Sequence, residues 1–68
     1  MDIRTLTARE HERMTASGWM RRTVRDDEMP AETVARYEEM GYDARAYRVT
    51  TSVRGFYRYI VMIRRTTA

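Results

Sequence analysis

The chain has 68 residues, a net charge of +3 and no cysteine. This length allows one domain, 1–68, with a thin core, because so short a chain buries only about 60% of the surface that its unfolded form exposes. Disulfides and cysteine-based metal sites are excluded, and the single histidine, His11, cannot build a usual zinc site alone. We therefore expect no cofactor and no metal, and we expect a partner chain to add stability.

The longest apolar run, Tyr59–Ile63, is far too short to cross a membrane. The N-terminus opens with an acidic residue and lacks the apolar core of a secretory signal. We expect a cytoplasmic protein without a membrane partner, and a viral or plasmid origin stays open.

Charge is distributed unevenly along this arginine-rich chain, which has no lysine. Residues 1–43 hold seven arginines and all ten acids, a net charge of −3, whereas residues 44–68 hold six arginines and no acid, a net charge of +6. Such a split is a hint of an anionic partner. The alternative is that the two halves pack together and neutralise each other.

The first expected element is a short helix over Ala8–Ala16. Thr7 and Glu10 have the spacing of a capping box at its start, and Gly18 suits the left-handed position after its end. A strand, Trp19–Arg25, follows, because its side chains alternate in character.

The second expected helix begins at Pro30, which suits the first helical position, and runs to Met40. Gly41 provides its stop. Two strands follow, over Asp43–Ser52 and Phe56–Arg65. The last strand is apolar on both faces, which is typical of the middle of a sheet.

The expected fold class is α+β: a short N-terminal helix followed by β-α-β-β. A right-handed crossover makes the first two strands parallel, and the third fits between them, antiparallel to both. The prediction is thus a three-stranded antiparallel sheet of order 1-3-2 with both helices on one face, a half ferredoxin-like, split βαβ arrangement. The segment Arg36–Tyr42 resembles the helix-to-strand corner of vicinal oxygen chelate modules, and this resemblance implies the same strand–helix–strand geometry.

The sheet face away from the helices mixes arginines with large apolar residues, and a monomer seldom leaves such a face idle. These residue types are enriched in protein interfaces. We expect a non-enzymatic accessory or regulatory protein that forms a homodimer or docks on a larger protein; an inhibitor carried by a phage or plasmid would have the same features. The expected partner-binding residues are Trp19, Arg21, Arg48, Phe56, Arg58, Ile60, Met62 and Arg64.

Single-stranded nucleic acid is the alternative partner, with bases stacked on aromatic rings and phosphates held by arginines. Arg54-Gly55-Phe56 resembles the opening of the octamer on the third strand of RNA-recognition motifs, which implies an RNA-binding sheet face. The likeness stops there, because Tyr57 stands where a small residue belongs and Arg58 replaces the second stacking aromatic.

A cofactor-independent small enzyme is the third reading. Its candidate residues are one histidine and four tyrosines, which at helix and strand spacing are typical of core aromatics with a polar tip. The chain has no Ser-His-Asp set and no Gly-rich phosphate loop, so we expect no catalytic residues. The candidates for this reading are His11, Tyr37, Tyr47, Tyr57 and Tyr59.

Overall fold

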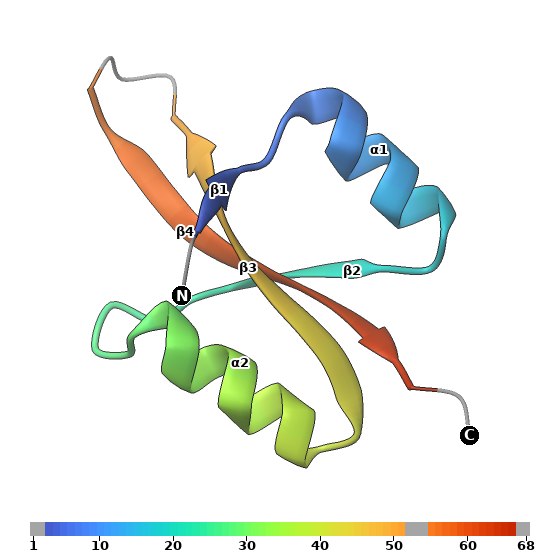
Figure 1. The fold of residues 1–68 in the computed structure, drawn as a ribbon. Helices are drawn as coiled ribbons and strands as arrows, with labels where there is room; N and C mark the ends of the chain where they lie inside the picture. Colours follow the sequence, from blue (N-terminus) through green and yellow to red (C-terminus); the bar gives the residue numbers. More distant parts are fainter. Residues whose placement is uncertain (1–2, 52–54, 67–68) are drawn as a thin grey trace.

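The structure, a computed structural model that describes residues 3–51 and 55–66, has two helices and a four-stranded sheet (Figure 1). The strand order is β1-β3-β4-β2. β1 runs parallel to β3, and the two other strand pairs are antiparallel. In chain order the elements are β1 (Arg4–Thr5), α1 (Ala8–Ala16), β2 (Met20–Thr23), α2 (Pro30–Glu39), β3 (Tyr42–Thr50) and β4 (Tyr57–Arg65).

The predicted sheet is wrong in the number of its strands, because the two residues of β1 pair with the edge of β3. A strand of two residues has no alternation that a sequence pattern could reveal. The three expected strands are present, with β4 between β2 and β3 as predicted. β2 is shorter than expected at both ends, and Ser52 of the expected second strand lies outside the described residues.

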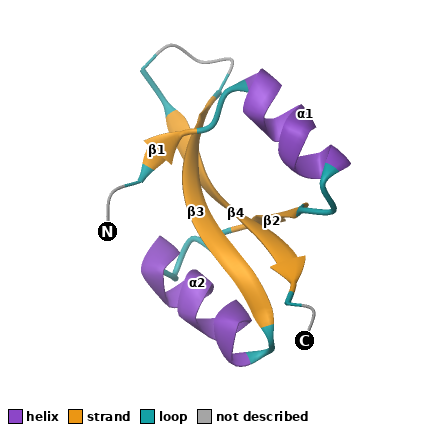
Figure 2. Cartoon of the chain, turned by 45° about the vertical axis from the view of Figure 1, so that its right-hand side comes forward, coloured by secondary structure: helices purple, strands orange, loops and turns teal. Residues whose placement is uncertain are grey.

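The prediction that both helices cover one face is also wrong, since α1 and α2 lie on opposite sides of the sheet (Figures 1 and 2). The reason is β1. The chain crosses the sheet from β1 to β2 through α1, and it returns from β2 to β3 through α2. Two crossovers of the same hand that run in opposite directions must use opposite faces. The predicted β-α-β-β unit is nevertheless present as β2, α2, β3 and β4, with β4 between β2 and β3, while β1 adds a fourth strand and α1 covers the other face.

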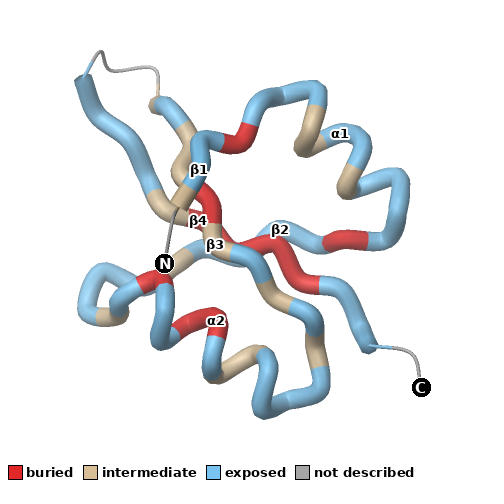
Figure 3. The backbone as a smooth tube through the Cα atoms, in the orientation of Figure 1, coloured by how far each residue is buried: buried red, intermediate tan, exposed pale blue. Residues whose placement is uncertain are grey.

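β4 divides the core into two layers, because its successive side chains point to opposite faces. Ile60 and Met62 pack on the α1 side, and Val61 and Ile63 pack under Val34 of α2. All four of these β4 residues are buried, which forms the buried stretch at the centre of the sheet in Figure 3. The core is therefore two thin layers on either side of one central strand.

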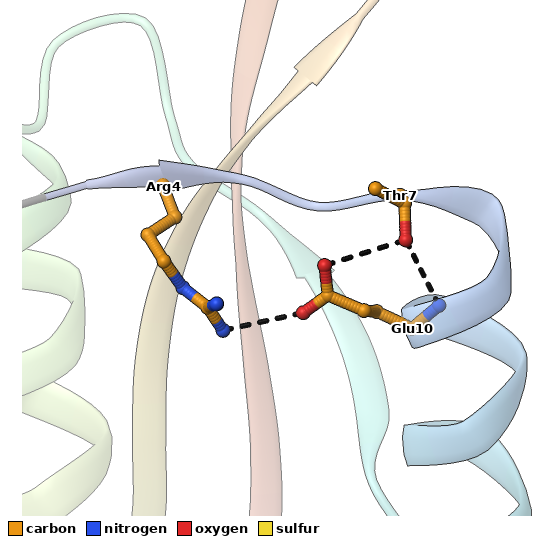
Figure 4. A network of polar contacts seen from close by, with 3 residues as sticks. All are labelled: Arg4, Thr7 and Glu10. Carbon is orange, nitrogen blue, oxygen red and sulfur yellow. Dashed lines mark hydrogen bonds and ion pairs between the residues drawn. The ribbon is translucent and has the colours of Figure 1, made fainter.

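Local signals fix both ends of α1. The Thr7 hydroxyl accepts a hydrogen bond from the Glu10 backbone N–H at 3.1 Å, and the Glu10 carboxylate accepts one from the Thr7 hydroxyl at 3.3 Å. Arg4 of β1 pairs with the same carboxylate at 3.2 Å (Figure 4). Gly18 and Gly41 both have a φ of 92°, so each ends its helix in the left-handed conformation that glycine tolerates.

Candidate functional site

An open hollow of about 860 Å³ lies beside the N-terminal end of α2, on the same face of the sheet as that helix. Its walls come from the β2–α2 connection, the first turn of α2 and the start of β4. α2 covers Val61 and Ile63 farther along β4 but does not extend over this end of the strand. The lining residues are Ile3, Val24, Arg25, Asp26, Glu28, Met29, Pro30, Thr51, Phe56, Tyr57, Arg58 and Tyr59.

Three large apolar side chains in this hollow are open to solvent. Met29, Phe56 and Tyr57 are 64%, 67% and 50% exposed. Met29 is the N-cap residue of α2 and makes no side-chain capping bond, and Phe56 directly precedes β4. Met29 and Phe56 each lie at the start of an element, so the hollow places its exposed apolar surface beside the starts of α2 and β4.

Two tyrosines form one wall of the hollow, and an arginine stacks on one of them. The Tyr57 and Tyr59 rings meet edge to face with centroids 5.5 Å apart. The Arg48 guanidinium lies 5.0 Å from the Tyr57 ring centroid, and its Nε and Nη2 donate to the Thr5 hydroxyl at 3.4 and 3.3 Å. The side-chain hydrogen bond with Tyr57, and then burial, raise the pKa of Tyr59, while the Arg48 charge opposes the rise. Tyr59 is therefore a neutral phenol at physiological pH.

Glu28, on the lip of the hollow, is held in its ionised form. The Thr33 hydroxyl donates to its carboxylate, and Arg36 donates to the same oxygen at 3.2 Å. The Thr33 bond is the largest cause that lowers the pKa of Glu28; burial opposes it, and the bond and charge of Arg36 add to the lowering. The contacts tie the β2–α2 connection to α2, which is a structural role.

The structure places three of the expected partner-binding residues in the core. Trp19 is 6% exposed, and Ile60 and Met62 are fully buried. They pack with Leu6 and Tyr47 beneath α1, which covers the face that the sequence left open. The expected exposure of Trp19, Ile60 and Met62 is therefore wrong.

The other five expected residues are divided between the two faces. Arg21, opposite Met62, and Arg64, opposite Asp43, lie on the α1 face, while Arg48, opposite Tyr59, lies on the α2 face. The expectation that Arg48 and Arg64 share one face is therefore wrong, because a shift of one residue along a strand moves a side chain to the other face. Residues directly opposite each other in an antiparallel pair share a face. Phe56 and Arg58 both line the hollow, and Arg48 stacks on Tyr57 of its wall. Arg58 lies opposite Val49 and so belongs to the α1 face by register, which means that it borders the hollow from the other side of β4.

The sequence reading missed Met29, Val24 and Ile3 of the hollow. A signal for Met29 was present. It directly precedes the proline that starts a helix, and a methionine side chain at this N-cap position does not accept a hydrogen bond from the first turn. Arg54 of the motif-like tripeptide lies outside the described residues.

The residues of the enzyme reading do not converge. His11 lines a separate small pocket of about 270 Å³ beneath α1, whereas Tyr57 and Tyr59 line the large hollow on the other face. The Nε2 atom of His11 is buried and has no hydrogen-bond partner. In residues 3–51 and 55–66, no group of three or more His, Asp or Glu side chains is placed to hold a metal ion.

Family models, curated proteins and solved structures were all compared with the chain, and none of them matches it. Within the described part of the chain, neither helix has the length and apolar character that a membrane crossing requires.

Proposed function

We propose that this chain is a small, non-enzymatic binding protein, an accessory or regulatory module that docks on another protein, or on a second copy of itself, through the hollow. One observation carries the proposal: Met29, Phe56 and Tyr57 are each at least half exposed and gather at the same depression. Methionine, aromatic residues and arginine are the types enriched at protein interfaces. Arg25 and Arg58 also line the hollow, and their charges can set the orientation of a partner.

Site-specific photo-cross-linking tests the proposal, with a photoreactive phenylalanine analogue placed at Phe56 or at Met40. Both side chains are large, apolar and exposed, at 67% and 60%, but Met40 follows the last turn of α2 and does not line the hollow. In extract of the source cells, we expect discrete protein adducts from position 56 and none from position 40. Identical adducts from both positions, or none from position 56, would contradict the proposal.

The oligomeric state separates the two kinds of partner. Light scattering behind a sizing column, at low and high salt, measures the mass of the parent and of a Met29→Ser, Phe56→Ser variant. If the parent is a dimer at both salt concentrations and the variant is a monomer, the second copy is the occupant, because an apolar contact responds weakly to salt. A parent monomer directs the search to the adduct from position 56.

A further inference from the structure

A second, polar surface lies on the α1 face, where two arginines stack on the single tryptophan. The guanidinium carbons of Arg45 and Arg64 lie 5.0 and 4.7 Å from the centroid of the Trp19 ring. In the register, Arg45 lies opposite Met62, two positions before Arg64, so the arginines share a face and come from adjacent strands. The ring is buried, whereas Arg45 is exposed and the Arg64 side chain is 44% exposed. The ring therefore forms an inner wall that orients two guanidinium groups toward solvent.

The positive charge at this surface is poorly compensated. Two like charges on one ring repel each other unless an anion lies close. Asp43 approaches Arg64, but at 3.9 Å and with both side chains about half exposed. The ion pairs found among the described residues include none made by Arg45. Asp43 therefore offsets one of the two positive charges only in part, and the remaining charge of the arginine pair favours an external anion.

We propose that Arg45 and Arg64 bind neighbouring phosphates of a nucleic-acid strand, independently of its base sequence. The planar fork of arginine matches a phosphate oxygen pair, and two forks on a single ring are close enough to contact successive phosphates. Stacking on Trp19 already restricts both side chains, which lowers the entropy lost on binding. The ring is buried under α1 and carries both arginines, so it does not stack a base, and phosphate contacts alone carry no sequence information.

This inference is independent of the docking hollow. The hollow is at the start of β4 on the α2 face, and the arginine pair is at the end of β4 on the α1 face. Both surfaces can therefore be filled together, and failure of one proposal leaves the other standing.

The test is a titration of labelled oligothymidylate, followed by fluorescence anisotropy over a series of salt concentrations. The Arg45→Gln, Arg64→Gln variant is expected to bind roughly tenfold more weakly at low salt. It should also reduce the slope of log K against log salt by about 1.4, which corresponds to two single-strand phosphate contacts. The Arg45→Lys, Arg64→Lys variant keeps both charges and should keep the slope.

The matched control removes two other exposed arginines, in the variant Arg9→Gln, Arg22→Gln. Arg9 is on α1, and Arg22 lies opposite Val61 on the other face of the sheet. We expect its slope to stay close to that of the parent. Circular dichroism and Trp19 emission establish that each variant is folded; if the glutamine pair melts, each single glutamine variant should lower the slope by about 0.7.

Three results would overturn the proposal. The first is an unchanged slope in the folded glutamine variants. The second is an equal loss in the Arg9, Arg22 control, which would show that bulk charge alone attracts the strand. The third is polyglutamate binding as tightly as oligothymidylate with the same dependence on Arg45 and Arg64, which would identify the site as one for the carboxylates of an acidic protein.

Discussion

α1 begins at a hydrogen-bonded N-cap and buries none of its own residues, whereas α2 has no side-chain cap and buries Pro30, Thr33 and Val34. α1 meets the sheet through half-buried Met14 and through Leu6 and Trp19, which flank the helix. Capping stabilises a helix against fraying but does not attach it to a sheet, because attachment comes from buried apolar surface. α1 therefore depends mainly on local capping for its stability, whereas α2 depends mainly on tertiary packing.

The largest expected effect distinguishes the two core layers. Ile63→Ala removes a nearly fully buried side chain that packs under α2, and we expect it to lower the free energy of unfolding by about 3 kcal/mol. Met14→Ala removes the half-buried contact of α1 and should cost far less in the global transition, because α1 can open while the sheet and α2 remain folded. Urea unfolding measures both values. Equal costs would show that α1 is attached as firmly as α2.

Amide hydrogen exchange should show the same contrast within one molecule. α1 can open while the sheet and α2 remain folded, since its residues are not buried. We expect the opening free energy of the α1 amides to be about 2 kcal/mol below that of the α2 and β4 amides. Uniform protection across both helices would contradict the comparison.

Acid should weaken the contacts that tie the β2–α2 connection to α2, because these contacts depend on ionised Glu28. The pKa of Glu28 is lowered from its ordinary value of 4.5, first by the Thr33 hydrogen bond. Ionised Glu28 therefore stabilises the fold at neutral pH, and this stabilisation is lost as pH falls from about 5 through the lowered value. In urea melts at a series of pH values, the parent should exceed Glu28→Gln at pH 7, with a difference that shrinks on acidification. Glu39→Gln, at the exposed end of α2, should follow the parent.

The smallest expected effect is on α1 itself. Thr7→Ala removes the acceptor of the Glu10 backbone N–H, and caps of this kind contribute about 1 kcal/mol. Because α1 opens on its own, the loss should appear in the exchange of the α1 amides and leave the global urea midpoint nearly unchanged. A shift of the midpoint that matches the exchange effect would mean that α1 unfolds only with the whole molecule.

Residues whose effect is local made much of the fold predictable. Thr7, Gly18, Pro30 and Gly41 fix the helix ends through backbone conformation and capping, which depend on near neighbours. The apolar character of β4 on both faces predicted its central position.

The layer arrangement could not be predicted in the same way, because it depends on β1. Two residues at a sheet edge decide that the first crossover runs opposite to the second, and so decide which face α1 covers. One signal went unused: a strand apolar on both faces requires a cover on each face, and Ile60 and Met62 needed one as much as Val61 and Ile63. Because this signal went unused, Trp19, Ile60 and Met62 were predicted to lie on a contact surface, although they belong to the core.

The burial of Trp19, Ile60 and Met62 beneath α1 separates this fold from the one expected from the sequence, and it directs the proposed protein contact to the hollow. Acrylamide quenching of tryptophan fluorescence tests this burial directly, since Trp19 is the single tryptophan and is 6% exposed. We expect blue-shifted emission and quenching far slower than that of free tryptophan, until urea unfolds the chain. Quenching of the folded protein as fast as that of free tryptophan would contradict this expectation, because Trp19 would then lie on an open face.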